Sequence, residues 1–419
     1  MSKPQGPGLR RALRVAPFPA YLCAISGWFF SFGLQTTLFS GVINYTLQES
    51  PERLGLAQAA LTAPMLLLLP LAGVVAERAD RRRIMTGFHL LAAGSAAAMA
   101  MLLFADRLAY LFLVAYALVV GVAGAFVMPA RDSAINAVVR VSGRMGRPIT
   151  LQKGVIIASL VQFAAQIAGM SAGFLAAMIG PAPLFAVQTA GLALGAAAAI
   201  ALPRLHARNA THARLADSLK DGLAAVAGSS ILAPMTGIMI AVGLLVVGGG
   251  FFVIVPILVR DVYEAGYEVL STLLVAFWLG AFAANVALAR AGAIERPGVT
   301  LMLAQLVTVV SMGLLAAPLP LGWMYVLVFG WGTGAGVAIS LSRAVVQENA
   351  PPDKIARVMS VYQLGLFGGM PAGALIMGYV VAAIGPRAAA LIPMAGLLLV
   401  LIVIAVFTPI LKVRRADPA

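Results

Sequence analysis

Ten long stretches of this sequence contain no Asp, Glu, Lys or Arg, and they constrain the fold more than any other feature. A membrane core about 30 Å thick is crossed by roughly 20 apolar residues, because a helix rises 1.5 Å per residue. Eight of the stretches are long enough for one such helix each, and the other two are about twice as long. The stretches are 15–48, 54–76, 84–105, 108–130, 154–203, 222–259, 269–289, 297–342, 358–386 and 388–411.

The two longest stretches are each interrupted near the middle by a proline-bearing turn. The first contains Gly180-Pro181-Ala182-Pro183, and the second contains Pro318-Leu319-Pro320. Proline removes a helical hydrogen bond and favours turns, so each of these stretches is interpreted as two helices. The sequence therefore predicts an all-α membrane protein with twelve transmembrane helices.

The charge balance predicts how these helices are oriented. Hydrophobic residues make up 61% of the chain and charged residues 11%, a composition that excludes a soluble domain of this length. Of the 29 Lys and Arg residues, 24 fall in segments that are cytoplasmic if the N-terminus is inside, and Lys153 lies near a helix start. The outer loops hold only Arg53, Arg107, Arg260 and Arg387. The net charge of +14 thus follows the positive-inside rule, and nucleic acid is not an expected partner. We expect a multi-pass protein of the bacterial inner membrane with both termini in the cytoplasm.

The chain divides into two halves that resemble each other. Residues 173–181 align with 378–386 at an offset of 205, with five of nine positions identical, and an offset of 212 pairs Arg131 with Arg343. We predict a six-helix bundle over 1–203, a cytoplasmic linker with an amphipathic helix over 204–228, and a second bundle over 229–419. Many secondary transporters consist of such repeats, with the substrate site between them.

The loop after the second span resembles the loop signature of the major facilitator superfamily, G-x-x-x-D-R-x-G-R-R. Here Glu77 stands in place of Asp and Asp80 in place of Gly. The resemblance implies the major facilitator fold and a cytoplasmic gate that braces the outward-facing state, with an acid at the inner end of the fourth helix as partner. Glycine at the start of the motif is expected to allow close helix approach. The residues assigned to the gate are Gly73, Glu77, Arg78, Asp80, Arg81, Arg82 and Asp132.

The segment 346–373 carries a second, narrower resemblance. It is similar to the branch of the superfamily that contains the enterobactin exporter and related bacterial secretion effectors, in which a "vP-x-x-x-r-g-R-v-x-s-l-y" segment precedes a Gly-rich eleventh helix. The branch implies export of siderophores, drugs or similar amphipathic molecules. Two family features are missing: the stretch 108–130 has no basic residue, and the glycine-rich part of the fifth helix has lost its proline. The loss of the proline weakens the case for antiport.

The substrate path is predicted to be neutral and aromatic, because no carboxylate lies at mid-depth in any span. Asp132 and Glu348, near inner helix ends, are the candidates for proton coupling. The cavity candidates lie on the helices that line the central cavity in the family and on their neighbours. Helix packing is the alternative interpretation for every one of them. They are Trp28, Phe32, Gln35, Thr36, Gln162, Gln166, Phe251, Trp278, Trp331, Tyr362 and Gln363.

We therefore predict a secondary active transporter that exports a small amphipathic molecule by alternating access, with proton antiport implied by the family. The alternatives are an uncoupled facilitator or importer, and a lipid-handling or sensing protein on the transporter fold. The three histidines show no metal or triad spacing, so we expect no enzyme, no metal and no cofactor. The expected partners are the lipid bilayer, a small-molecule substrate and protons, and the expected state is a monomer.

Overall fold

The computed structural model describes residues 17–144, 151–204, 215–291, 294–351 and 354–413. Within these residues, twelve helical segments are long and apolar enough to cross a membrane, as predicted. The first six contain α2 (Pro17–Gly41) with η1 (Val42–Thr46), α3 (Pro51–Arg78), α4 (Arg81–Phe104), α5 (Tyr110–Arg144), α6 (Leu151–Ala172) with η2 (Gly173–Leu175) and α7 (Ala176–Ile179), and α8 (Pro181–Ile200).

The second six follow a short helix in the predicted linker, α9 (Leu215–Ala227). A backbone inside a membrane must satisfy its own hydrogen bonds, so these apolar segments are helical throughout. They comprise α10 (Leu232–Ala241) with η3 (Val242–Ile254), α11 (Val255–Ile257) and η4 (Leu258–Val262), then α12 (Tyr267–Ala291), α13 (Pro297–Leu315), α14 (Leu321–Asn349), α15 (Ile355–Ile384), and α16 (Pro386–Ala389) with α17 (Leu391–Phe407). The short η5 (Pro409–Lys412) ends the described chain.

The two proline-bearing turns of the sequence repeat are built alike. Gly180 and Gly385 both have positive φ, at 77° and 78°, and each is followed by a proline that begins the next helix. Glycine adopts this conformation without steric cost, and proline suits the first helical position. The aligned Gly-Pro pairs therefore mark the corresponding corner in each half.

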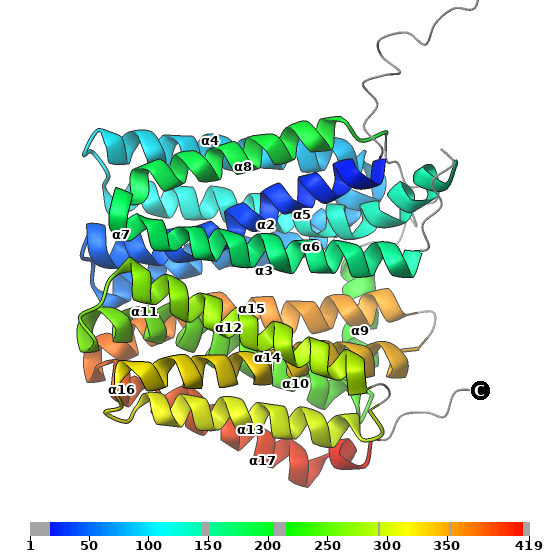
Figure 1. Cartoon of the computed structure of the whole chain (residues 1–419). Helices are drawn as coiled ribbons and strands as arrows, with labels where there is room; N and C mark the ends of the chain where they lie inside the picture. The colour runs from blue at the N-terminus through cyan, green and yellow to red at the C-terminus, as the bar shows by residue number, and fades with distance from the viewer. Residues whose placement is uncertain (1–16, 145–150, 205–214, 292–293, 352–353, 414–419) are drawn as a thin grey trace, which may run out of the picture.

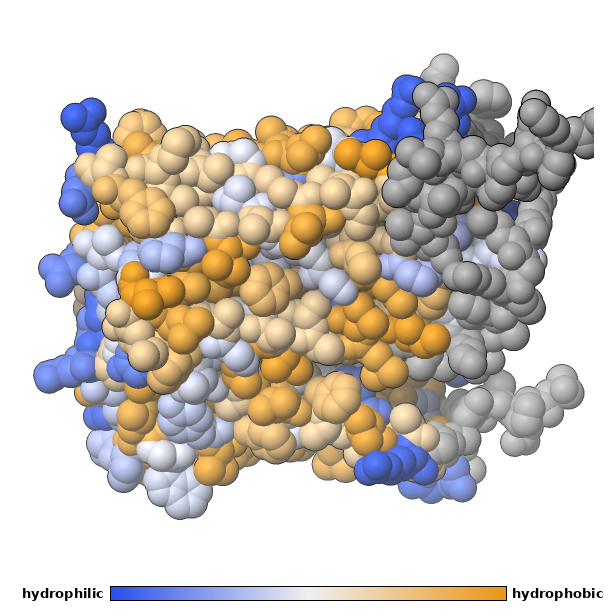
Figure 2. Space-filling model, turned by 45° about the horizontal axis from the view of Figure 1, so that its top comes forward, coloured by the Kyte–Doolittle hydropathy of each residue, from blue (hydrophilic) through white to orange (hydrophobic). Residues whose placement is uncertain are grey.

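The helices run side by side in two groups (Figure 1). In the first group α4 and α8 lie farthest from the second group, while α3 packs along α15 and the α6–α7 segment packs on α12. Figure 2 shows a broad hydrophobic band between two ends that carry the hydrophilic residues. Large apolar side chains such as Phe407, 80% exposed, lie on the outside of the helices, as expected for contact with lipid.

Two helices extend well beyond their uncharged stretches. The fourth span is predicted over 108–130, but α5 continues to Arg144, and α14 likewise continues past residue 342 to Asn349. Charged residues end the apolar stretch without ending the helix, because a charged side chain leaves the backbone hydrogen bonds of the helix intact. The seventh span differs from a regular α-helix, because its Gly248-Gly249-Gly250 run lies inside the π-helix η3. The predicted boundaries of the two bundles and the linker stay predictions.

Candidate transport site and gates

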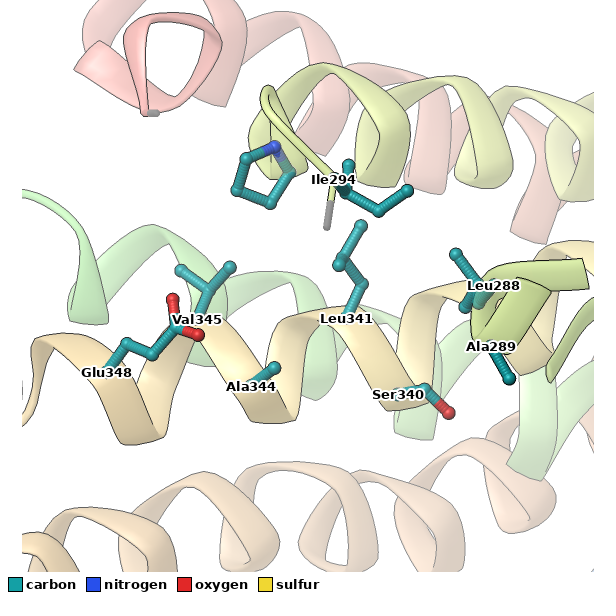
Figure 3. A pocket seen from close by; sticks show the side chains of 9 residues that line it. Leu288, Ala289, Ile294, Ser340, Leu341, Ala344, Val345 and Glu348 are labelled. Carbon is teal, nitrogen blue, oxygen red and sulfur yellow. The ribbon is translucent and has the colours of Figure 1, made fainter. Parts of the chain in front are cut away.

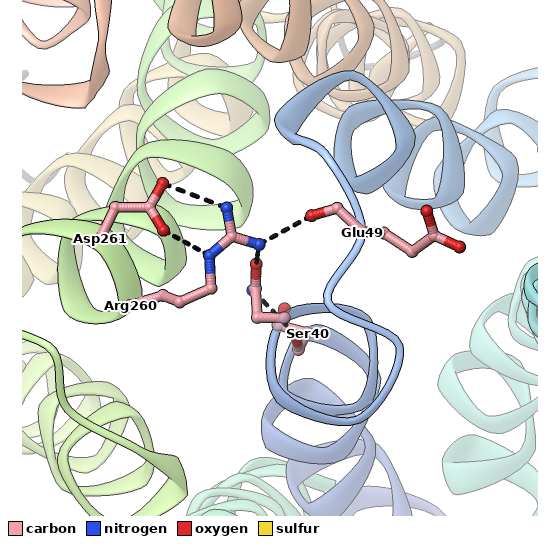
Figure 4. Close-up of polar contacts among 5 residues, drawn as sticks. Ser40, Glu49, Arg260 and Asp261 are labelled. Carbon is pink, nitrogen blue, oxygen red and sulfur yellow. Dashed lines mark hydrogen bonds and ion pairs between the residues drawn. The ribbon is translucent and has the colours of Figure 1, made fainter.

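A polar latch joins the two halves at the end that charge predicts to be outside, which we call the outer end. Arg260 of η4 donates from Nη1 to Asn44 Oδ1 at 3.1 Å and to the Glu49 carbonyl at 2.7 Å. Its Nε and Nη2 donate to Asp261 at 2.5 and 3.1 Å. Figure 4 shows the guanidinium between Asp261 and the first-half loop. Because Arg260 is in the second half and its acceptors are in the first, this outer latch holds the outer ends together.

Tyr267, at the start of α12, adds a second contact across the outer end. Its hydroxyl lies 3.1 Å from Thr46 Oγ1, and its ring centroid lies 5.0 Å from that of Tyr45. A Cβ at Gly41 would come within 2.0 Å of the Tyr267 ring, so glycine is needed for this approach. One turn further in, Ser271 Oγ donates to the Met170 carbonyl at 2.5 Å. The α12 end is therefore fixed on the first half by several groups.

The opposite side of the interface is a seam of small residues between α3 and α15. A Cβ at Gly55 would lie 2.5 Å from the Ala374 carbonyl oxygen, and one at Gly378 would lie 2.8 Å from the Pro51 carbonyl oxygen. Such close backbone approach is how helices associate within a membrane. Further along the seam, Leu66 lies 3.0 Å from the Cβ position of Gly368.

The first-half cavity candidates fall into two groups. Phe32, Thr36 and Gln162 are half-buried, and Gln162 accepts from Arg131 Nη1 at 2.6 Å. By contrast, Gln35 and Gln166 are buried, and their Nε2 atoms have no hydrogen-bond partner in the described structure. They belong to helices that approach very closely, since a Cβ at Gly33 would lie 2.1 Å from the Gln166 carbonyl oxygen.

Trp28 is buried inside the first bundle and makes an edge contact with His89 at 5.1 Å between ring centroids. Both ring nitrogens of His89 lie near backbone carbonyls, with Nδ1 2.7 Å from Met85 O and Nε2 3.2 Å from Ala24 O. This geometry is that of a packing position between α2 and α4.

Three second-half candidates meet in one aromatic cluster around Phe277. Its ring centroid lies 4.8 Å from Phe251, 5.8 Å from Trp278 and 5.3 Å from Trp331. Trp331 and Phe251 are buried, whereas Trp278 is half-buried and lies 6.2 Å from Phe163 of the first half. The cluster thus reaches the interface between the halves through Trp278.

The two candidates on α15 have different surroundings. The buried Tyr362 has its hydroxyl 2.6 Å from Ser342 Oγ of α14. Gln363 is half-buried and adjacent to it in the chain. Tyr362 is therefore held in a contact between helices, while Gln363 keeps part of its surface accessible.

The predicted cytoplasmic gate is described in part. The side chains of Glu77 and Arg78 lie outside the described residues. Asp80 accepts from the Arg82 backbone N–H at 3.1 Å and caps α4, which explains an acid where the family has glycine. Arg82 Nη1 also donates to the Leu202 carbonyl at 3.2 Å, so the loop is tied to the end of α8.

Other gate residues are placed as follows. Arg81 is buried. A Cβ at Gly73 would meet no atom of the described residues within 4 Å, so the close helix approach expected at this glycine is not seen in this conformation. Asp132 pairs with Arg131 at 2.9 Å and its side chain is 55% exposed. The gating role of these residues stays a prediction.

Glu348 lies in a pocket of about 310 Å³ between α12, α13 and α14 (Figure 3). Apart from Glu348 and Ser340, the pocket is lined by apolar residues. A second pocket of about 460 Å³ between α12 and α14 is lined mainly by alanines. Neither pocket includes a predicted cavity residue.

The sequence reasoning missed the outer latch and the contacts of Arg131. Arg260 is one of the few positive residues in predicted outer loops, and that rarity is the signal that could have singled it out. The charge pattern assigns Arg131 only to the cytoplasmic side, whereas in the structure it contacts residues of two other helices, α2 and α6. Neither contact set could be read from spacing, because the partners are far apart in the chain.

Comparison with known proteins decides the family. The profile of a family described as transmembrane secretion effectors matches residues 29–418. The chain belongs to this family. No curated protein matches. Among solved structures, the nucleoside transporter NupG aligns with a TM-score of 0.76 and 12% identity, covering 93% of this chain and 98% of that one.

Two further solved structures share the fold. The peptide transporter POT aligns with a TM-score of 0.73, 14% identity and 98% coverage of both chains. A bacterial homologue of the human lysosomal transporter Spinster, in an inward-facing and occupied conformation, has a TM-score of 0.66 and 14% identity, with 99% of this chain and 100% of that one covered. The protein is thus a transporter of the major facilitator type, and the predicted fold is confirmed.

Proposed function

We propose that this secretion-effector family member exports a small amphipathic molecule across the bacterial inner membrane by alternating access, with its termini in the cytoplasm. The outer latch carries the proposal: Arg260 joins the outer ends of the two halves through Asn44 and Glu49. A closed outer end suits loading of an exporter from the cytoplasm. The exposed Asp132 and Arg343, in the inner parts of α5 and α14, support an opening on that side.

An amphipathic substrate is supported by the exposure and chemistry of the candidate cavity residues. Half-buried aromatic rings such as Phe32 and Trp278 supply apolar contact area, while Gln162 and Gln363 supply amide groups. Apolar walls with a few polar groups are typical of small-molecule sites. A molecule with an apolar body and a polar group fits such a lining better than an inorganic ion or a sugar.

Proton antiport is the drive that we propose, with Asp132 and Glu348 as the titrating groups. Both are accessible, since Asp132 is exposed and Glu348 borders a pocket. An uncoupled facilitator is the second candidate function. It is favoured by one observation, that the twelve spans carry no carboxylate at mid-depth.

Transport in reconstituted vesicles tests the proposal. Purified protein in liposomes is given dyes, drugs and catecholate siderophores, with and without an imposed pH gradient, and protein-free liposomes serve as control. We expect accumulation of at least one compound that depends on the gradient. Transport of a compound at the same rate with and without the pH gradient would assign the protein to the facilitators. No transport of any compound would reject the export function.

A further inference from the structure

Arg131 is held in a geometry that a merely cytoplasmic charge does not need. Its guanidinium carbon lies 4.5 Å from the centroid of the Phe29 ring, and Nη1 donates to Gln162 Oε1 at 2.6 Å. The Tyr21 hydroxyl donates to the Arg131 carbonyl at 3.2 Å. The Arg131 side chain is only 15% exposed. Residues from α2, α5 and α6 thus fix one cation in place.

These contacts place the guanidinium on the side of α2 that lies away from α8. The rear of α2 packs on α8, where Ser31 Oγ donates to the Gln188 carbonyl and a Cβ at Gly27 would lie 2.5 Å from the Gly191 carbonyl oxygen. Phe29 follows Gly27 by two residues, about 200° around the helix, so its ring points away from α8. Because α8 lies far from the second half (Figure 1), the guanidinium on this ring lies on the side of α2 away from the rear of the first half.

The guanidinium keeps hydrogen-bonding capacity for a ligand. It has five N–H donors, of which Nε is used by Asp132 and one Nη1 donor by Gln162. Nη2 makes no hydrogen bond with any described residue. Asp132 can turn into water, because more than half of its side chain is exposed. An arginine fixed on an aromatic ring with its outer edge open is suited to bidentate binding of an oxyanion.

We propose that Arg131 binds the acidic group of the transported molecule, so that the substrate class is an amphipathic organic anion. This inference rests on the proposed function, because it takes the path between the halves as the substrate path. The oxyanion pairs with Nη2 and the second Nη1 donor, while the apolar body lies along the half-buried Phe32. Gln162 and Phe29 act as positioning residues that hold the guanidinium flat.

The sequence repeat supplies a matched comparison. Arg343 is the counterpart of Arg131 at the offset of 212 and lies at the corresponding depth of α14. It is exposed, and no hydrogen bond or ring contact holds it among the described residues. Removing either arginine changes the net charge equally, but only Arg131 is built into a fixed site.

Binding in lipid nanodiscs tests the inference without requiring transport. The probes are dansylglycine and dansylglycinamide, which share one fluorescent body and differ in carboxylate against carboxamide. Empty phosphatidylcholine discs provide the subtraction. We expect Arg131→Gln to weaken dansylglycine binding by about tenfold or more, the change that loss of a charge-assisted hydrogen bond produces. The affinity of Arg131→Lys for dansylglycine should fall between those of the wild type and Arg131→Gln. The affinity of Arg343→Gln should stay within about twofold of the wild type.

The outcomes separate this inference from the proposed function. Three outcomes would overturn the anion site, even if the vesicles show export. They are equal affinity of the wild type for both probes, no binding of dansylglycine, and equal losses of affinity in the Arg131 and Arg343 variants. Competition by phosphatidylglycerol in the discs would assign the site to lipid headgroups and overturn the substrate class. Selective loss in Arg131→Gln supports the site, whatever the vesicle assay shows of direction or coupling.

Discussion

Replacing Arg260 with Gln should shift the protein towards the outward-open state. The change removes two hydrogen bonds from a guanidinium to the first half, at 3.1 and 2.7 Å, each of a kind that contributes about 1.5–3 kcal/mol. The Arg260 side chain is 20% exposed, so water replaces part of what is lost. We expect a net loss of about 2 kcal/mol for the closed outer end, which raises the outward-to-inward ratio about 30-fold.

The ratio can be measured by distances between spin labels at the outer end. Labels on Arg107→Cys and Ala383→Cys report the separation of the halves, in a background where the exposed Cys23 is replaced by Ser. Arg53→Gln is the matched control: it also removes an outer arginine, but Arg53 pairs with Glu49 within the first half. If Arg260→Gln leaves the distance distribution at wild type, or moves it no more than the control does, the latch does not hold the outer end.

Three further predictions follow from packing and charge. Gly33→Ala should lower stability by about 1–3 kcal/mol, because the added Cβ meets a carbonyl oxygen at 2.1 Å. Gly94→Ala meets no described atom within 4 Å and should raise stability by up to about 1 kcal/mol. Thermal unfolding in detergent measures both changes. Asp221→Asn breaks an exposed ion pair with Arg357 and should change stability by less than about 1 kcal/mol in the same assay. Glu77→Ala should slow vesicle transport at unchanged expression, and a wild-type rate would remove the gating assignment.

The spans could be predicted from the sequence because a bilayer imposes one simple demand on every segment that crosses it. The Gly-Pro corners could be predicted as well, since Gly180 and Gly385 need a backbone conformation that glycine adopts easily. Helix ends were less predictable. The charge at Arg131 ends an apolar stretch, but nothing in water prevents the helix from continuing to Arg144.

The site was harder to predict because its contacts join distant parts of the chain. Asn44 and Arg260 are separated by 216 residues, and no local pattern indicates that they meet. Buried Gln166 and half-buried Gln162 lie one helical turn apart, yet the first sits in a helix contact and the second holds Arg131. A polar residue in an apolar stretch indicates a partner, but the facing helix decides which one.

The π-helical turns of the seventh span provide a way to break the contacts of the outer latch. Arg260 lies within a five-residue π-helical turn, downstream of the thirteen-residue stretch η3. The backbone hydrogen bond joins residues i and i+5 in a π-helix and residues i and i+4 in an α-helix. Each turn that changes from π to α therefore has one residue fewer within its hydrogen-bonded ring. The part of the helix beyond that turn then rotates by about 100° about the helix axis. Such a rotation would carry the guanidinium away from Asn44 without bending the helix axis.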